Sequence, residues 1–255
     1  MTTTPSHELL GLAVVAADRA ASWLSDHQSG VVVTSTKSTS TDIVTAADTA
    51  AEELIRQALQ AVRPGDAFLG EESQARQGTT GVRWIVDPID GTVNYWYGLP
   101  TWSVSIAAEL DGEVVAAVVQ APGLGRRYTA SADGAWCNEL PITASTCDDL
   151  SQALLATGFS YDATERGRQG AALAELLPQV RDVRRLGSAA LDLCLLAAGE
   201  VDLYYERGPA LWDVAAGAFI AQRAGASVAV DGPLTAGSSQ ALWSPFRSAL
   251  ERAGA

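Results

Sequence analysis

The chain has few of the side chains that hydrolases commonly use as a nucleophile or a general base. Among its 255 residues there are only two histidines, His7 and His27, both in the amino-terminal region and remote from the other polar motifs. This distribution argues against a Ser-His-Asp triad, a phosphohistidine mechanism and a histidine-ligated zinc hydrolase. Any catalytic chemistry is therefore expected to use other groups.

Cysteine is almost as scarce. Cys137, Cys147 and Cys194 are odd in number, widely spaced and without a Cys-x-x-Cys pair, so the sequence indicates neither a disulfide framework nor a zinc site. None of them precedes a Gly-rich phosphate loop that ends in arginine, which argues against a cysteinyl-phosphate intermediate. We expect a reducing, cytoplasmic location.

Long apolar runs are missing as well. No run approaches the roughly 20 residues of a membrane span, and the apolar stretch 9–17 is broken by Asp18 and Arg19. The residues before this stretch lack the basic segment of a signal peptide. The pattern predicts a helix near the amino terminus and a chain that does not enter a membrane.

Positive charge is also scarce, and Lys37 is the only lysine. Lysine and arginine together number 17 against 30 acidic residues, which gives a formal net charge of -13. Such a surface repels nucleic acid and anionic membranes, so we expect neither as a partner. A phosphorylated substrate would be repelled in the same way. A phosphate-handling site in this chain therefore requires bound cations.

Two nucleotide-binding motifs are absent, namely the Gly-x-x-x-x-Gly-Lys-Ser/Thr loop and a credible Gly-x-Gly-x-x-Gly fingerprint. The Asp-x-Asp-Gly-Thr motif of aspartyl-phosphate enzymes is partly matched by Asp90, Gly91 and Thr92. Pro88, however, stands where the nucleophilic aspartate would be. Water activated by a metal ion remains the simplest nucleophile.

The most informative segment that is present spans residues 84–95. Its apolar start predicts a strand that ends near Asp87, where Asp-Pro and Asp-Gly favour a turn. Asp87 and Asp90 are three residues apart, and the Ile89 carbonyl lies between them as a neutral oxygen ligand. Mg²⁺ prefers hard oxygen ligands of this kind. The alternative at this point is an ordinary solvated turn.

The two residues after this pair suggest a place for phosphate. Gly91 allows the backbone to approach a ligand closely, and Thr92 offers a hydroxyl and an amide at a predicted helix start, where anions are stabilised. Metal and phosphate could meet here.

The hydrophobic pattern elsewhere predicts a layered α/β chain in one domain, with an amino-terminal half at about 1–145 and a carboxy-terminal half at about 146–255. Helices are predicted at 6–26, 46–62, 165–177, 189–198 and 215–223. Strands are predicted at 67–70, 102–110, 113–120, 153–157, 183–186 and 201–205.

At this point the motifs resemble those of the inositol monophosphatase family of Mg²⁺-dependent, lithium-sensitive phosphatases. Three of them occur in the family's order: Gly70-Glu71-Glu72-Ser73, the segment from Asp87 to Asn94, and the segment from Leu211 to Gly217. The likeness extends to Lys37, Asp42-Ile43-Val44-Thr45 and Asp48, to Gly187-Ser188-Ala189-Ala190, and to Tyr205-Glu206. It covers nearly the whole chain.

The resemblance implies a five-layer α-β-α-β-α sandwich, a homodimer and two or three Mg²⁺ ions. Glu71, Asp87 and the Ile89 carbonyl would hold the first ion. Asp87, Asp90 and Asp213 would hold the second, with Asp87 bridging the two. Glu71 and Thr92 would orient and deprotonate the attacking water, and Asp90 would complete the catalytic group.

The resemblance also implies a substrate site. Substrate contacts would come from a set of residues around the metals: Asp90, Gly91, Thr92, Gly187, Ser188, Ala189, Glu206 and Asp213. A mobile segment that carries Lys37, Asp42 and Asp48 would cover the site as a lid and help to bind a weaker third metal ion. Alone, Asp213 has the simpler interpretation of a helix N-cap, and Glu206 that of a charge at a strand end.

The expected reaction is hydrolysis of a small phosphorylated polyol, inositol 1-phosphate first. Relatives of the superfamily hydrolyse histidinol phosphate, fructose 1,6-bisphosphate or adenosine 3′,5′-bisphosphate, and these stay open as alternatives. A further alternative is a non-catalytic regulatory protein that keeps the phosphatase fold.

Overall fold

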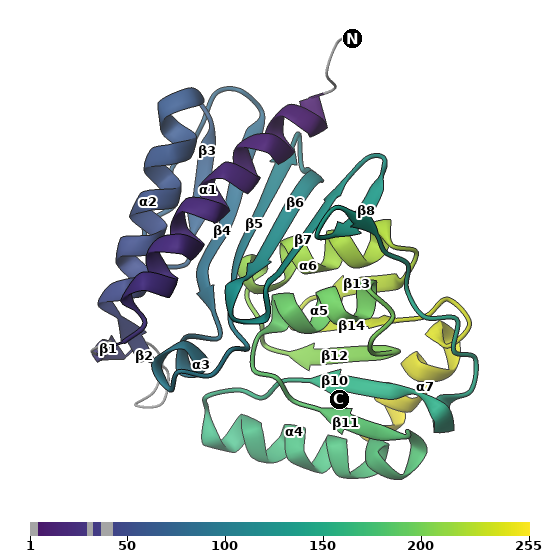
Figure 1. Ribbon diagram of the computed structural model, residues 1–255. Coiled ribbons are helices and arrows are strands. Elements are labelled where there is room, and N and C mark those ends of the chain that lie inside the picture. The colour runs from purple at the N-terminus through teal and green to yellow at the C-terminus, as the bar shows by residue number, and fades with distance from the viewer. Residues whose placement is uncertain (1–4, 30–32, 37–42) are drawn as a thin grey trace.

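The computed structural model describes residues 5–29, 33–36 and 43–255, and its helices alternate with two large sheets (Figure 1). The larger sheet has the strand order β3-β4-β5-β6-β7-β8-β9, and the smaller has the order β11-β10-β12-β14-β13. A two-stranded ribbon, β1-β2, lies apart from both.

The strands of the ribbon and of the larger sheet have these bounds: β1 Val33–Thr36, β2 Ile43–Thr45, β3 Ala67–Gly70, β4 Val82–Asp90, β5 Ser103–Leu110, β6 Glu113–Ala121, β7 Arg126–Ser131, β8 Gly134–Cys137 and β9 Leu140–Pro141. Those of the smaller sheet are β10 Leu154–Thr157, β11 Asp182–Arg184, β12 Leu203–Arg207, β13 Ser227–Asp231 and β14 Leu234–Ser238. The α-helices are α1 Pro5–His27, α2 Ala46–Val62, α3 Thr92–Trp96, α4 Ala163–Leu176, α5 Ala189–Ala197, α6 Leu211–Arg223 and α7 Trp243–Ala253.

Helices α1 and α2 cover the outer face of the larger sheet (Figure 1). The buried stripe of α1 consists mainly of alanines at helical spacing, between Leu9 and Leu24, and the small side chains allow the helix to lie close to strands β5 and β6. This face forms one core together with Trp84 and Tyr95. Among the described residues, none of the helices combines the length and apolarity needed to cross a membrane.

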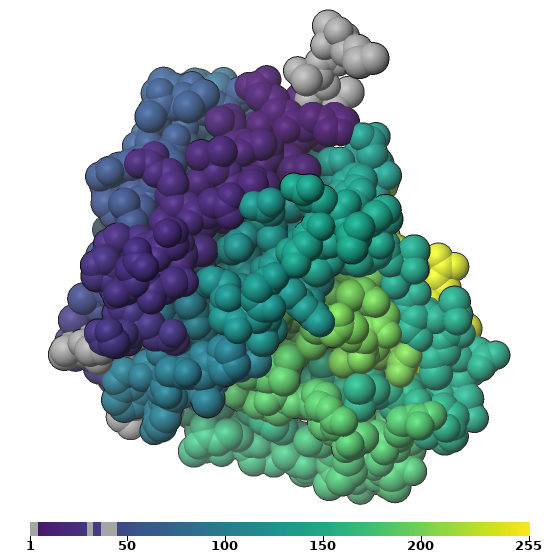
Figure 2. All heavy atoms as spheres, viewed as in Figure 1, coloured from purple at the N-terminus to yellow at the C-terminus, as the bar shows by residue number. Residues whose placement is uncertain are grey.

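Helices α5 and α6 fill the space between the two sheets. Every residue of α5 is buried, and both helices share one core with strands of the larger sheet and with Tyr204 of β12. Helices α4 and α7 cover the far face of the smaller sheet, where Leu176 and Phe246 pack against Leu203. The layers therefore run α-β-α-β-α, which confirms the predicted five-layer sandwich. On the face drawn in Figure 2, the green segments of the carboxy-terminal half meet the teal strands along a continuous border.

The sequence pattern missed several elements. Strands β7 to β9, the hairpin β13-β14 and helix α7 were not predicted; the missed strands are short, whereas α7 is an amphipathic helix of 11 residues that the pattern could have revealed. The predicted strand 201–205 lies two residues later, at Leu203–Arg207. Helix α6 begins at Leu211, four residues before the predicted start.

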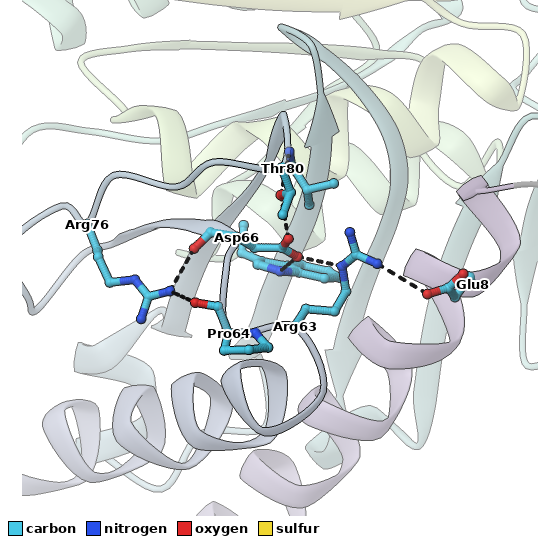
Figure 3. A network of polar contacts seen from close by, with 8 residues as sticks. Glu8, Arg63, Pro64, Asp66, Arg76 and Thr80 are labelled. Carbon is cyan, nitrogen blue, oxygen red and sulfur yellow. Dashed lines mark hydrogen bonds and ion pairs between the residues drawn. The ribbon is translucent and has the colours of Figure 1, made fainter.

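A buried carboxylate fixes the loop that connects β3 to β4. Asp66 accepts hydrogen bonds from Arg63 Nε at 2.6 Å, Thr80 Oγ1 at 2.6 Å and Trp84 Nε1 at 2.9 Å (Figure 3). Arg63 also reaches Glu8 of α1 at 3.2 Å. Because Asp66 is 3% exposed, its charge depends on these partners rather than on water. The network ties α1, the connecting loop and β4 into one unit.

Candidate active site

The first two acidic residues meet because β3 and β4 are parallel neighbours. Gly70 pairs with Val86, and the Glu71 amide donates to the Val86 carbonyl at 3.2 Å. Glu71 therefore leaves the end of β3 beside Asp87. Their carboxyl groups lie within hydrogen-bonding reach of each other.

Strand β4 does not end at Asp87, as the sequence predicted, but continues to Asp90 with an irregular register. Asp87 pairs with Ser105 and Asp90 with Ser103, so three steps along β4 match two steps along β5. Ser103 and Ser105 are two residues apart and share one face of the sheet. The extra residue, beside Pro88 with its missing N–H, therefore turns both aspartates to the same face.

Asp90 is held at the start of helix α5. Its carboxylate accepts hydrogen bonds from Ser188 Oγ at 2.6 Å, the Ala190 amide at 2.7 Å and the Ala189 amide at 3.3 Å. Ser188 is also the N-cap of α5, since its hydroxyl accepts from the Leu191 amide. The free amides at a helix start favour a negative charge. This contact joins the larger sheet to the middle helix layer.

Asp213 comes from helix α6 and lies in its first turn, not at the N-cap. The Ala210 amide donates to its carboxylate at 2.5 Å. The earlier start of α6, at Leu211, is the reason for the difference, because it places Asp213 two residues inside the helix. The carboxylate thereby stabilises the helix start while it faces the other acids.

The charges of this group repel one another. Burial raises the pKa of Asp87 well above its usual value, and the negative charges of Glu71, Asp90 and Asp213 raise it further. Burial also raises the pKa of Asp90 to about 7, although the hydrogen bonds from Ser188 and Ala190 act in the opposite direction. The pKa of Asp213 is raised well above normal, by burial first and then by Asp90 and Glu71. Such a group is stable as carboxylates only when cations neutralise it.

The donor set suits a hard cation. All the groups that meet here offer oxygen, and the described residues provide neither histidine nor cysteine at this place. Within the described ranges, no group of three or more histidine, cysteine, aspartate or glutamate side chains is already arranged to hold a metal ion by itself. Mg²⁺ does not require such a group, because it usually keeps several waters and binds one or two carboxylates. The carboxylates and the Ile89 carbonyl therefore fit Mg²⁺ better than an ion that takes all of its ligands from the protein.

Thr92 connects the acidic group with helix α2. Its hydroxyl lies 3.0 Å from both the Ile89 carbonyl oxygen and Asp48 Oδ1. Asp48 is 1% exposed and caps α2 by accepting from the amide and hydroxyl of Thr45. Of the three predicted lid residues, Asp48 belongs to a buried helix start, whereas Lys37 and Asp42 lie outside the described residues.

A cavity of about 320 Å³ opens above the carboxylates. Except for the three lid residues, every predicted site residue lines it: Glu71, Asp87, Ile89, Asp90, Gly91, Thr92, Gly187, Ser188, Ala189, Glu206 and Asp213. Its volume matches that of sites for small molecules. Residues from both halves of the chain are needed to form it.

Comparison with known proteins decides the family. The inositol monophosphatase family model matches residues 6–242. The chain belongs to the inositol monophosphatase family. It is 50% identical to the inositol-1-monophosphatase of Mycobacterium leprae over 202 residues, which cover 75% of this chain and 69% of that protein. It is 37% identical to the Nus factor SuhB of Escherichia coli over 226 residues, with coverage of 87% and 85%. The solved structure of Mycobacterium tuberculosis SuhB is 39% identical, with a TM-score of 0.86 and coverage of 98% of each chain.

In this inositol monophosphatase family member, Glu206 lines the same cavity, and its charge also raises the pKa of Asp90 and Asp213. Tyr204 Oη donates to its carboxylate at 3.1 Å. A Cβ on Gly158 would lie 2.2 Å from the carboxyl carbon of Glu206, so any other residue there would require the Glu206 carboxylate to move. Burial raises the pKa of Glu206, while the Tyr204 hydrogen bond and the charge of Arg185 lower it.

Sequence reasoning missed part of the cavity wall. The loop 158–161 and Arg185 line it, and neither was predicted as part of the site. A signal was present, because β10 and β12 were both predicted as strands of an α/β unit. Strands β10 and β12 are parallel neighbours, and their carboxyl ends therefore reach the same edge of the sheet. The residues that follow β10 would be expected there.

Proposed function

We propose that the chain is a Mg²⁺-dependent phosphatase that hydrolyses a small phosphorylated polyol, inositol 1-phosphate first. The observation that carries this proposal is the set of four acids, Glu71, Asp87, Asp90 and Asp213, that line one cavity of substrate size, with Asp87 and Asp90 buried. Family membership supports the same reaction class. The acids provide the negative charge that bound cations must offset before a phosphate can enter.

The ligand assignment follows from the positions of the oxygens. Glu71, Asp87 and the Ile89 carbonyl would hold one Mg²⁺ ion, and Asp87, Asp90 and Asp213 would hold a second. Bound Mg²⁺ would lower the pKa of water and stabilise the charge of the phosphate in the transition state. Asp87 lies in the middle of the group, since the charges of Glu71, Asp90 and Asp213 all raise its pKa. It is therefore assigned as the shared ligand.

The chain's own residues would place the attacking water and the phosphate. Glu71 is the base that accepts the proton of the water, because it stands at the open end of β3 and is only partly buried. The Thr92 hydroxyl donates toward Ile89 and Asp48, which leaves its oxygen able to accept a hydrogen bond from the same water. The backbone amides of Gly91 and Thr92 would donate to phosphate oxygens.

The alcohol part of the substrate would lie toward Glu206. This carboxylate can accept hydrogen bonds from hydroxyl groups, and Gly187, Ser188 and Ala189 form the adjacent wall. A polyol supplies hydroxyl donors, which suit an acidic acceptor.

The test measures release of inorganic phosphate from inositol 1-phosphate, histidinol phosphate, fructose 1,6-bisphosphate and adenosine 3′,5′-bisphosphate, with and without Mg²⁺. We expect Mg²⁺-dependent turnover that is fastest with inositol 1-phosphate. The Asp90→Asn variant should lose turnover while its circular dichroism spectrum stays that of the wild type. The exposed Asp182→Asn variant is the matched control. Equal turnover in wild type and Asp90→Asn would refute the proposed site.

A second candidate function is regulatory binding without catalysis. One observation favours it: a relative from Escherichia coli that is 37% identical over most of this chain is named as a Nus factor. The net charge of -13 weakens it for any direct contact with RNA. The phosphate-release assay distinguishes the two, because a purely regulatory protein would hydrolyse none of the four esters.

A further inference from the structure

Two loops from neighbouring strands enclose the alcohol end of the cavity. The first, residues 158–161, follows β10, and the second, residues 207–210, follows β12. Strands β10 and β12 pair in parallel up to Thr157 and Tyr205, so both loops leave the sheet at the same edge. Arg207, the last residue of β12, still pairs with Leu234 of β14, but the pairing between β10 and β12 has ended by then. The sheet therefore holds the start of the second loop without joining it directly to the first.

A single side chain of α4 bridges these loops. Gln169 is 6% exposed, and its Oε1 accepts a hydrogen bond from the Ser160 amide at 2.7 Å. Its Nε2 donates to the Arg207 carbonyl at 2.9 Å. One amide group thus holds the backbone of both loops. Gln169 itself does not line the cavity.

The first loop is also held on its outer side. Arg166, one turn earlier on α4, donates to the carbonyl oxygens of Ser160 and Tyr161 at 3.0 and 3.2 Å. Ser160 is therefore bound by α4 at both its amide and its carbonyl group. Arg166 makes no contact of this kind with the second loop, so Gln169 alone provides the bridge among these α4 contacts.

We propose that Gln169 is a positioning residue that sets the width of the alcohol end of the cavity, and so selects the alcohol part of the substrate. The inference rests on the proposed phosphatase function for its kinetic readout. Only a side chain with both an acceptor and a donor at this length can serve both loops. Glutamate would keep the acceptor for Ser160 but lose the donor to Arg207, and leucine would lose both.

The phosphate end should not depend on this bridge. Asp87 and Asp90 are fixed by β4 and α5, and Asp213 by α6 and by the Ala210 amide at the far end of the second loop, whereas the Gln169 hydrogen bond holds this loop only at Arg207. Loss of the bridge should therefore raise KM for a polyol phosphate and leave kcat and the Mg²⁺ requirement nearly unchanged. A phosphate ester with a simple aryl group, 4-nitrophenyl phosphate, has no hydroxyls to be recognised and should serve as the internal reference.

The experiment compares wild type, Gln169→Leu, Gln169→Glu and the control Gln179→Leu. Gln179 has the same side chain, but it donates to the Glu175 carbonyl and accepts from Arg252 of α7 at 3.5 Å, away from the cavity. For Gln169→Leu we expect KM for inositol 1-phosphate to rise about tenfold, in line with the loss of two buried hydrogen bonds, and KM for 4-nitrophenyl phosphate to change less than twofold. Gln179→Leu should match the wild type.

Hydrogen exchange of the Ser160 amide gives a readout independent of activity. Exchange should accelerate at least tenfold in Gln169→Leu and remain close to wild type in Gln169→Glu, which retains the acceptor. If Gln169→Leu fails to fold, Gln169→Glu decides: an unchanged ratio of the two KM values would overturn the proposal. Slow Ser160 exchange in a folded Gln169→Leu would overturn it as well. If the wild type hydrolyses no phosphate ester, the phosphatase proposal fails, and exchange at Ser160 still tests the bridge.

Discussion

Protons and Mg²⁺ should compete for the acidic group, and the competition should be visible in the stability of the protein. The pKa of Asp90 is about 7 in the folded chain, against a reference of 3.8. Between these values the folded state binds a proton that the unfolded state has released. The free energy of unfolding of the metal-free protein should therefore fall as the pH rises from about 4 to 7.

The size of this effect follows from the same interval. The interval spans about three pH units at about 1.4 kcal/mol each. The titration of Asp90 alone should therefore lower the free energy of unfolding by about 4 kcal/mol, and about 3 kcal/mol of this decrease should occur between pH 5 and 8. Asp87 and Asp213 act in the same direction, because their pKa values are also raised. Mg²⁺ would bind only the deprotonated group, so its stabilising effect should be large at pH 8 and small at pH 5.

Urea unfolding followed by tryptophan fluorescence, with EDTA or with Mg²⁺, would measure this at pH 5, 6, 7 and 8. Asp90→Asn should flatten the slope found in EDTA. In the control Asp182→Asn the slope should persist, because hydrogen bonds from Arg184 and Val183 lower the pKa of Asp182, whose titration therefore falls below this window. The reasoning is refuted if the free energy of unfolding in EDTA is flat or rises over this range in the wild type and Asp90→Asn leaves it unchanged.

Three further variants test other parts of the structure. Gly158→Ala places a methyl group against Glu206, so KM for inositol 1-phosphate should rise several-fold in steady-state kinetics, with little change in folding. An unchanged KM would contradict the role of Glu206. Asp66→Ala removes three hydrogen bonds of a buried carboxylate and should lower the free energy of unfolding by about 3 kcal/mol in a urea titration, with kcat unchanged. Ser188→Ala removes the cap of α5 and the hydrogen bond to Asp90, so the free energy of unfolding should fall by about 2 to 4 kcal/mol and the pKa of Asp90 should rise further. A variant whose stability depends on pH as in the wild type would argue against this.

The sequence was most informative where local chemistry alone determines the structure. Helix α2 matches its predicted bounds because the Thr45 cap and the apolar stripe ending near Leu59 are both local signals. The acidic residues of the site were recognisable as motifs, and all of them line one cavity. Their family resemblance, rather than their spacing alone, made this expectation specific.

The missing parts depend on contacts between distant segments. The irregular pairing of β4 requires its partner β5, so a strand that continues through Pro88 was not foreseeable from turn propensity. Likewise, Gln169 looks like an ordinary polar residue on a helix, and only the loops that fold over it reveal its two hydrogen bonds. Short edge strands such as β9 carry too few residues for a period to be detected.

The extra residue in β4 makes the distance along the chain between Asp87 and Asp90 as important as their chemical identity. At the present spacing, regular pairing with β5 would turn one carboxylate to the opposite face of the sheet, so the residue count and the irregular register are matched, and a change in one requires a change in the other. Natural length variation should therefore be absent from this segment and be found instead in exposed connections such as the Asp111-Gly112 turn. The site tolerates chemical change at its rim, but it cannot tolerate a change in the count of residues at its base.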